Sequence, residues 1–279
     1  MPELPEVESV RRRIAPSLVR ARIVGVDLRR PDLRQPFPRH FVKRLTSQTV
    51  LALTRRAKYL LAALSSGETL LMHLGMSGSF RVVSGRPAAR AASPAGNRDP
   101  HDHVVFHLSS GTALVFNDPR RFGVMDLVPA GAVDAHPLLS RLGPEPLSDA
   151  FDATALARAC RGKRTSLKAA LLDQRVVAGL GNIYASEALH VAGLSPRRRA
   201  SILATPAGAP REAAERLAAA IKAVLTQAIA RQSGDPYRDS RFLVYERQDA
   251  RCLKPQCRGT IRRVMQDGRS TFYCPVCQR

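Results

Sequence analysis

Apolar and polar positions along the chain follow two different periods. In residues 5–19 the apolar side chains of Val7, Val10, Ile14 and Leu18 recur at helical spacing, with Pro5 in the first turn and acidic residues near the start. Short β-rich runs bounded by Gly, Ser and Asn follow, at residues 22–28, 49–55, 58–64, 69–75, 79–83, 103–109, 112–118 and 123–129. The pattern predicts an N-terminal helix and then a β-sandwich or barrel, and it disfavours a parallel βαβ sheet.

The pattern changes to helical spacing in the second half of the chain. Residues 136–151 are rich in proline and polar turn residues, whereas residues 152–232 contain helical stretches such as "SLKAALLDQ", "IYASEALHVAG" and "REAAERLAAAIKAVLTQAIARQ". We expect an α+β multidomain protein with an N-terminal β-sandwich domain at 1–135, a linker at 136–151, a helical domain at 152–244 and a small module at 245–279. Residues 84–100, with many small and proline residues, are expected to form a mobile loop.

Charge is the first indication of a partner. The chain has 44 Lys and Arg against 23 Asp and Glu, a net charge of +21, and the basic residues are distributed over its whole length. A surface of this kind attracts polyanions and releases their counterions, so nucleic acid is the expected partner. The alternative is that a GC-rich genome has enriched Arg codons without any partner. An anionic membrane is a weaker candidate, because the sequence has no basic amphipathic helix.

The sequence shows none of the usual signs of a membrane or exported protein. Hydrophobic residues make up 44% of the chain, and no apolar run approaches the roughly 20 residues of a membrane span. Glutamates stand where a signal peptide would be basic or apolar. We therefore expect a soluble, cytoplasmic protein associated with the nucleoid and no membrane partner.

Four of the five cysteines form a metal-binding pattern. Cys252, Cys257, Cys274 and Cys277 read Cys-x4-Cys-x16-Cys-x2-Cys, with "QDG" at the turn of a hairpin-length segment between the pairs. Four thiolates at this spacing can surround one tetrahedral structural Zn²⁺. So small a module has too little core to fold without a bound metal ion or a similar cross-link. Disulfides are the alternative, which a cytosolic location disfavours. The fifth, Cys160, is expected to be a small buried apolar side chain. The arginines of the module are expected to face DNA: Arg258, Arg262, Arg263 and Arg269.

The first residues suggest a chemistry of their own. Removal of Met1 from "MPELPEVE" would leave Pro2 with a free secondary amine, a nucleophile that can form an iminium with the C1′ carbon of an opened deoxyribose. Glu3 could protonate the sugar ring oxygen and help to open the ring. The alternative is that these residues only begin a helix. Taken alone, the stretch does not decide between the two.

Further segments favour the catalytic interpretation. The motifs "PELPEVE", "RRAKYLL", "HLGMSGS", "HDH", "DPRRFG", "LGPEPL" and "GLGNIYASEAL" stand in order before the cysteine module. In this order the sequence resembles the formamidopyrimidine-DNA glycosylases, bifunctional DNA glycosylase/AP lyases, over nearly its whole length. The resemblance implies a helix-two-turns-helix (H2TH) DNA-binding domain at 152–244 and a zinc finger at 245–279. It also implies a monomer that acts on damaged double-stranded DNA and needs zinc but no small-molecule cofactor.

The resemblance assigns roles to individual residues. Pro2 matches the Schiff-base nucleophile, Glu3 the general acid, Lys58 the proton-transfer lysine of β-elimination, and Arg269 the finger arginine of δ-elimination and phosphate contact. Lys58 lies in one of the predicted strands, where a solvated charge would otherwise be the ordinary interpretation.

Other positions match residues that contact DNA. Asn182 matches the phosphate-binding asparagine of the H2TH motif, and His101, Arg120 and Lys163 fall on DNA-contact positions of the family. For Asn182 the alternative is a helix cap, although the amides of a helix N-terminus also suit a phosphate. Met76, Arg120 and Phe122 match the residues that fill the gap in the duplex, and without the family match Met76 and Phe122 would be expected in the core. His101 and His103 lack further ligands at metal-binding spacing, so we expect one of them to contact a phosphate.

The expected reaction begins with extrusion of the damaged nucleotide, because a base inside the stack exposes neither its glycosidic bond nor C1′. Attack by Pro2, loss of the base and β,δ-elimination then leave a gap of one nucleotide. Two features depart from the family. The first cysteine pair is spaced x4, not x2, and residues 232–247 are short and lack the loop that caps 8-oxoguanine. We therefore expect formamidopyrimidines and abasic sites to be better substrates than 8-oxoguanine.

Three other functions compete with this one. An endonuclease VIII-like glycosylase would act on oxidised pyrimidines, but that group typically begins "PEGPE". A catalytically silent reader of damaged DNA would not require Pro2, Glu3 and Lys58 together. A zinc-ribbon accessory factor would explain only the last part of the chain.

Overall fold

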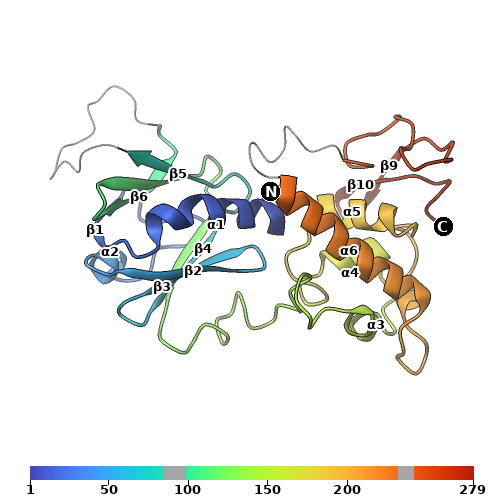
Figure 1. Ribbon diagram of the computed structural model, residues 1–279, viewed down its shortest axis with the longest axis horizontal. Helices are drawn as coiled ribbons and strands as arrows, with labels where there is room; N and C mark the ends of the chain where they lie inside the picture. Colours follow the sequence, from blue (N-terminus) through green and yellow to red (C-terminus); the bar gives the residue numbers. More distant parts are fainter. Residues whose placement is uncertain (85–98, 232–241) are drawn as a thin grey trace. The chain divides into compact units, whose positions relative to one another are not determined.

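The computed structural model describes residues 1–84, 99–231 and 242–279, and these form two compact units. One unit contains residues 6–140 together with Met1 and Pro2, and the other contains residues 141–279 together with Glu3–Pro5 (Figure 1). Each unit is considered by itself below. The loop expected at residues 84–100 lies almost entirely outside the described residues. Among the described helices, none combines the length and the apolar character needed to span a membrane.

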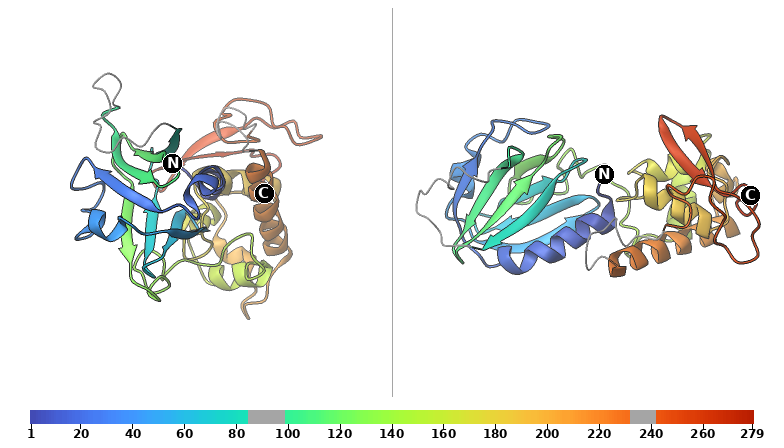
Figure 2. Two further views of the ribbon diagram at one scale, coloured as in Figure 1. Left: turned by 60° about the vertical axis from the view of Figure 1, so that its left-hand side comes forward. Right: turned by 90° about the horizontal axis from the view of Figure 1, so that it is seen from above.

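Two antiparallel four-stranded sheets make up the first unit, in the orders β1-β6-β7-β5 and β2-β3-β4-β8 (Figure 2). Buried side chains of both sheets form one core, including Ile23, Leu60, Phe80 and Phe116. The fold is therefore the predicted β-sandwich, with each expected run forming a strand. The strands are β1 (Ile23–Leu28), β2 (Val50–Arg56), β3 (Tyr59–Leu64), β4 (Thr69–His73), β5 (Ser79–Ser84), β6 (Asp102–Leu108), β7 (Thr112–Asn117) and β8 (Val124–Val128).

Helix α1 (Leu4–Leu18) is the predicted N-terminal helix. Its residues Val7, Ile14 and Leu18 are buried in the sandwich core, as the helical spacing indicates. A second helix, α2 (Phe41–Leu45), was not predicted. With five residues it is too short to show a period, and its buried residues Phe41 and Leu45 give the only apolar signal.

The second unit begins with short helices and ends in a finger. Its helices are α3 (Ala153–Cys160), α4 (Leu167–Leu172), α5 (Asn182–Val191), the 3-10 helix η1 (Ala200–Leu203) and α6 (Glu212–Arg231). Helix α5 is buried on all sides from Ile183 to His190, including the polar side chains of Ser186 and Glu187. Cys160 is fully buried, as expected.

The finger contains an antiparallel hairpin of β9 (Arg262–Gln266) and β10 (Arg269–Tyr273). The two residues of its turn, Asp267 and Gly268, have φ values of 49° and 71°. This is the left-handed backbone that an Asp-Gly hairpin turn favours, so the "QDG" signal predicted the turn correctly.

A buried carboxylate links α1 to β2 in the first unit. Glu8 accepts hydrogen bonds of 2.8 Å from Arg11 and from Arg12, and Arg55 on β2 approaches to 3.4 Å. Burial opposes ionisation of Glu8, but hydrogen bonds from Arg11 and Arg12 and the nearby charges outweigh it and lower its pKa to about 2. The ionised form is therefore favoured in the folded protein.

We predict that Glu8→Gln lowers the free energy of unfolding by about 2 kcal/mol at neutral pH. Because the folded pKa lies below the ordinary value of 4.5, the stabilisation is complete above that pH and is lost as the pH falls toward 2. Denaturant unfolding of both proteins from pH 7 down to the acid range measures the difference. A difference that stays constant with pH would contradict the assignment.

Candidate active site and nucleic-acid interface

Lys58 lies in a tight turn and not in a strand, which corrects the prediction. The paired residues Arg56 and Tyr59 end β2 and begin β3, so Ala57 and Lys58 form the turn between them. Ala57 has a left-handed φ of 53°, and its carbonyl oxygen accepts a hydrogen bond of 2.9 Å from Arg55. The sequence did not reveal the turn because it contains neither Gly nor Asn. Lys58 is buried, with 7% of its surface exposed.

His73, at the end of β4, is close enough to Lys58 to be affected by its charge. Burial first, and then the charges of Lys58 and Arg34, lower the pKa of His73 to about 4. The imidazole is therefore neutral at neutral pH, and its Nδ1 accepts a hydrogen bond of 3.0 Å from the Gly75 amide. This bond shapes the turn that leads to Met76.

The loop that carries Met76 packs directly on the loop that carries Phe122. Gly75 has a φ of 64°, and a Cβ atom at this position would lie 2.3 Å from the carbonyl carbon of Phe122. Only glycine allows this approach of the two backbones. Met76 and Phe122 are exposed to 37% and 42%, which is unusual for large apolar side chains.

Asp118 holds the two loops together. Its fully buried carboxylate accepts hydrogen bonds from the Ser77 hydroxyl at 2.6 Å and from the Gly123 amide at 2.8 Å. Ser77 in turn accepts a bond of 3.1 Å from the Arg120 amide, and the Arg120 guanidinium lies 4.8 Å from the centre of the Phe122 ring. The structure thus brings together the three residues expected to enter the duplex.

The two histidines of "HDH" differ in accessibility. His103 is buried and its Nε2 lies 2.9 Å from the carbonyl oxygen of Asp118, whereas His101 is exposed. Within the described ranges, neither belongs to a group of side chains that could hold a metal ion. Of the two, His101 is the one that can reach a phosphate.

In the second unit, the carboxylate of Glu3 lies at the N-terminus of α5. It accepts hydrogen bonds from the amides of Gly181 at 2.6 Å, Ile183 at 2.8 Å and Tyr184 at 3.3 Å. The helix has no side-chain cap from its own N-cap residue. Glu3 therefore takes the place of a cap, and these amides are not free to bind the phosphate that the sequence analysis considered for them.

Asn182, the first residue of α5, contacts the finger. Its Nδ2 donates a hydrogen bond of 3.0 Å to the Ser270 carbonyl oxygen, next to the exposed Arg269. Lys168 on α4 donates to the same oxygen at 2.8 Å and to the Thr271 hydroxyl at 2.7 Å. Two side chains of the helical domain thus position the strand that carries Arg269.

Lys168 is not among the site residues predicted from the sequence. Burial first, and then the charge of Arg269, lower its pKa to about 8, although Glu3 opposes the shift. The sequence contained a signal, because Lys168 stands among apolar residues in "SLKAALL". In the structure, Lys168 is buried together with Leu167, Ala170 and Leu171 of α4. A lysine on the apolar face of a helix indicates a buried partner. Of the remaining predicted residues, Pro2 and Lys163 are both partly exposed, and Lys163 lies 4.0 Å from Asp173.

The four cysteines of the finger meet in one place. The sulfur atoms of Cys252, Cys257, Cys274 and Cys277 all lie within 4.8 Å of one another. Cys252 and Cys277 are 3.8 Å apart, and Cys257 and Cys274 are 3.6 Å apart. A tetrahedron with Zn–S bonds of about 2.3 Å has edges of about 3.8 Å, so the sulfur positions fit a zinc ion. The x4 spacing keeps all four ligands.

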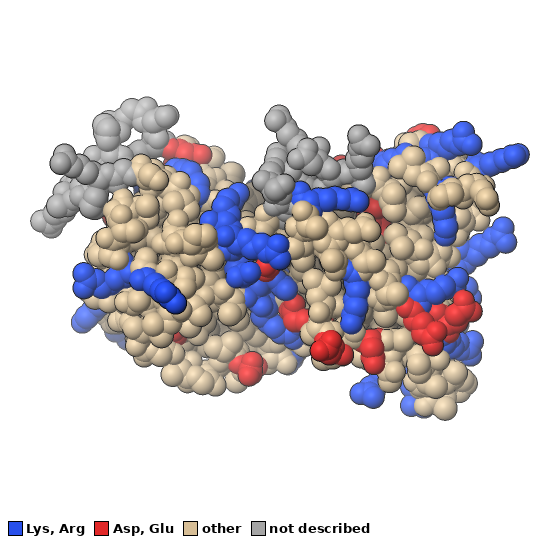
Figure 3. All heavy atoms as spheres, viewed as in Figure 1, with Lys and Arg blue, Asp and Glu red and all other residues tan. Residues whose placement is uncertain are grey.

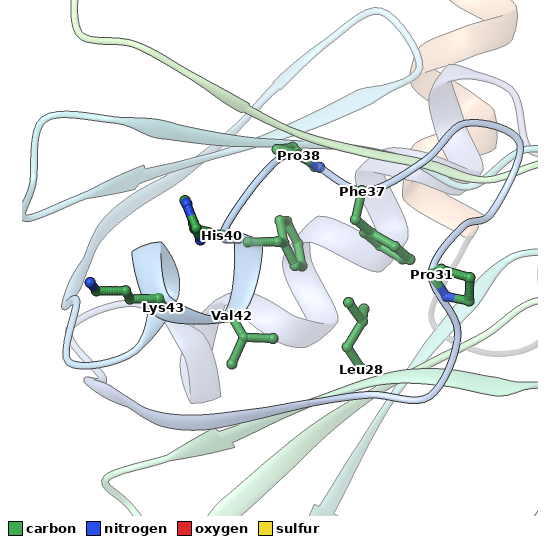
Figure 4. Close-up of a pocket in the computed structure, with 8 residues that line it drawn as sticks. Leu28, Pro31, Phe37, Pro38, His40, Val42 and Lys43 are labelled. Carbon is green, nitrogen blue, oxygen red and sulfur yellow. The ribbon is translucent and has the colours of Figure 1, made fainter.

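The surface carries the charge expected from the composition. Lys and Arg side chains are distributed over the face of both units seen in Figure 3, and Asp and Glu are fewer. An apolar pocket of about 470 Å³ lies in the first unit, lined by residues that include Leu28, Phe37 and Val42 (Figure 4). It includes none of the predicted site residues.

Comparison with protein families matches the chain in three consecutive parts. Residues 1–125 match the formamidopyrimidine-DNA glycosylase N-terminal domain, residues 142–237 its H2TH domain, and residues 255–279 a zinc finger found in FPG and IleRS. The chain belongs to the formamidopyrimidine-DNA glycosylase family. The finger match begins after Cys252, yet the structure places the Cys252 sulfur with the other three.

Relatives match over the full length. Formamidopyrimidine-DNA glycosylases of Azorhizobium caulinodans and Bradyrhizobium diazoefficiens are 56% and 55% identical, covering 100% of both chains. The Thermus thermophilus MutM structure has 38% identity and a TM-score of 0.81, covering 99% of this chain and 98% of that one. A Lactococcus lactis glycosylase bound to DNA containing an AP site has 29% identity and a TM-score of 0.85, covering 99% of each chain.

We predict that Gly75→Ala separates the Met76 and Phe122 loops. The left-handed backbone costs alanine about 1 kcal/mol, and the clash with Phe122 should raise the loss of stability to about 3 kcal/mol or more. Gly131→Ala is the matched control, because Gly131 has a φ of 74° but nothing within 4 Å of its Cβ position. Denaturant unfolding measures the stability, and titration with abasic-site duplex measures the binding. Equal losses in the two variants would contradict the packing argument.

Proposed function

We propose that this protein is a base-excision-repair enzyme that removes oxidised purines from duplex DNA and then cleaves the strand at the abasic site. The observation that carries the proposal is the placement of Glu3, the residue directly after Pro2. Its carboxylate accepts hydrogen bonds from three backbone amides at the N-terminus of α5. The full-length relatives bear the name of this activity, and Lactococcus lactis relatives have been solved with DNA containing an abasic site or FAPY-dG.

Pro2 is the proposed nucleophile. The structure contains Met1, so the Pro2 nitrogen is part of a peptide bond there, and removal of Met1 must precede catalysis. The freed secondary ammonium gives a proton to a neighbouring carboxylate, for which Glu3 is the candidate. The neutral amine then attacks C1′ as the bond from C1′ to the base breaks, and the departing base takes the bonding electrons and the remaining proton of the Pro2 nitrogen. Glu3 returns the proton to the sugar ring oxygen, the ring opens, and an iminium joins Pro2 to C1′.

The iminium is an electron sink for the two eliminations. Lys58 is proposed to transfer the C2′ proton during β-elimination, and its buried position in a fixed turn suits a group that must be held in one place. Arg269 is proposed to assist δ-elimination and to contact a phosphate. The hydrogen bonds from Lys168 and Asn182 to the adjacent Ser270 support this role by fixing the strand.

Extrusion of the nucleotide must precede the chemistry, and unstacking costs a few kcal/mol. Met76, Arg120 and Phe122 are proposed to fill the space that the nucleotide leaves, because exposed apolar side chains on a rigid loop pair can act as wedges in kinked DNA. His101, Lys163 and Asn182 are proposed phosphate contacts. The basic surface supports the salt-dependent part of binding (Figure 3).

The proposed lesion preference rests on the length of residues 232–247. Most of the shortened 232–247 segment lies outside the described residues, so the inference from its length is unchanged: formamidopyrimidines and abasic sites are proposed as better substrates than 8-oxoguanine. Oxidised pyrimidines are a second candidate class, because a Lactococcus lactis relative has been solved with DNA containing one. We further propose that the enzyme acts as a cytoplasmic, nucleoid-associated monomer.

Borohydride trapping tests the nucleophile. We expect wild-type protein to form a covalent adduct with duplexes containing a formamidopyrimidine or an abasic site, and Pro2→Gly to lose most of it. Glu3→Gln is the informative control. It retains the amine and should be trapped on a preformed abasic site far better than on an intact lesion. Full trapping of Pro2→Gly would exclude the proposed chemistry, and rates for 8-oxoguanine equal to those for formamidopyrimidine would refute the preference.

Removal of zinc tests the finger. We predict that chelation, or Cys274→Ser, weakens duplex binding and lowers its dependence on salt concentration, because arginines such as Arg263 lose their fixed position. Circular dichroism should still report the sandwich and the helical domain. Affinity and salt dependence that do not change on loss of zinc would argue against a DNA-binding finger.

A further inference from the structure

The zinc cysteines have a neighbour that comes from the helical domain. His190 lies in the last turn of α5 and is 2% exposed. Its Nε2 is 3.3 Å from the Cys252 sulfur and 3.8 Å from the Cys277 sulfur. One imidazole nitrogen therefore faces the edge that joins two of the four sulfurs.

Packing alone does not account for a histidine at this position. The residues before it, Ala188 and Leu189, are fully buried and apolar. Among the described residues, the Nδ1 atom of His190 is buried without any hydrogen-bond partner. Burying such an atom without a partner is unfavourable, and a leucine would avoid this cost. The interaction that offsets the cost must come from the other nitrogen, which faces the sulfurs.

A zinc ion with four thiolates carries a net charge of −2, so buried sulfurs of this kind need hydrogen-bond donors. Cys257 has one, since the Gly259 amide lies 3.4 Å from its sulfur. Cys252 and Cys277 belong to the other half of the centre, and His190 lies in the corresponding position beside them. The Lys254 backbone also donates a hydrogen bond to Cys252, so His190 adds a side-chain donor from a helix outside the finger.

Cys252 differs from the other three cysteines in its place along the chain. It is separated from Cys257 by the longer x4 spacing and lies before residue 255, where the match to the zinc-finger family begins. His190 lies within the span matched to the H2TH domain, residues 142–237. A residue of the H2TH span therefore contacts a sulfur that lies just outside the residues matched to the zinc finger.

We propose that His190 is a positioning residue of the zinc centre, whose Nε2–H donates a hydrogen bond to the Cys252 thiolate and holds this sulfur in the coordination sphere. The bare Nδ1 fits this tautomer, because the single proton of a neutral imidazole then lies on the nitrogen that faces the sulfur. The proposal concerns the metal centre and does not depend on the roles proposed for Pro2 or Lys58.

One consequence concerns helix α5 as a whole. The same ten-residue helix presents its first amides to Glu3 and its last turn to Cys252. Helix α5 therefore contacts both the carboxylate of Glu3 and the zinc cysteines.

The test uses full-length protein loaded with Zn²⁺ or Co²⁺. We expect His190→Leu to lower zinc affinity by about tenfold to a hundredfold in competition with a chromogenic chelator. It should also move the sulfur-to-cobalt charge-transfer band to lower energy, because the thiolate loses a hydrogen bond. His190→Gln retains an N–H donor and should restore most of both properties.

Leu189→Ala is the matched control, since it loosens the same part of α5 without removing a group that faces the sulfurs. We expect its cobalt spectrum to be that of the wild type. The proposal is overturned if His190→Leu has wild-type zinc affinity and spectrum, or if Leu189→Ala reproduces both of its changes.

A measurement on the wild type covers the case in which His190→Leu does not fold. In protein loaded with an NMR-active cadmium isotope, the His190 Nε2 proton should exchange slowly and show a weak coupling to the metal through the sulfur. A proton on Nδ1 in place of Nε2 would overturn the proposal. Direct bonding of the imidazole to the metal would also overturn it, because His190 would then be a ligand.

Discussion

The interaction on which the arrangement of the site depends is the binding of the Glu3 carboxylate by the amides of α5. Three backbone N–H groups point at one carboxylate, with the positive end of a helix dipole behind them. The bond fixes the first residues of the chain to a buried helix, so Pro2 cannot move as a free terminus would. The nucleophile proposed at Pro2 would therefore have little conformational freedom left to lose on reaching the transition state.

The same kind of interaction occurs elsewhere in the structure, where buried carboxylates accept hydrogen bonds from the backbone amides of irregular segments. Asp118 binds the Gly123 amide and the Ser77 hydroxyl, and thereby holds two loops together. Glu187 accepts hydrogen bonds from the amides of Leu243, Val244 and Tyr245 at 2.7 to 2.9 Å. A buried charge is costly unless it is fully hydrogen-bonded. These loops are therefore held in place as much by their hydrogen bonds to the carboxylates as by apolar packing.

Features with a periodic or spacing signal could be predicted from the sequence, whereas others could not. The strands follow from short β-rich runs, the long helices from apolar residues at helical spacing, and the zinc site from cysteine spacing. The five-residue α2 has no period to read, and the turn at Ala57 and Lys58 lacks turn residues, so Lys58 was wrongly placed in a strand. The cap of α5 could not be predicted, because Glu3 binds the backbone amide of a residue 178 positions away in the sequence, and a backbone amide leaves no mark in a sequence.

The polar residues of the buried helix α5 connect it to other segments of the second unit. A helix buried on every side would be expected to be apolar throughout, yet this one contains Asn182, Glu187 and His190. Each reaches a different segment: the finger strand at Ser270, the chain at Leu243–Tyr245, and the cysteine sulfurs. An apolar residue at any of these positions would lose the corresponding hydrogen bonds. The helix therefore determines where its partners lie, and its polar residues contribute to specific arrangement more than to net stability.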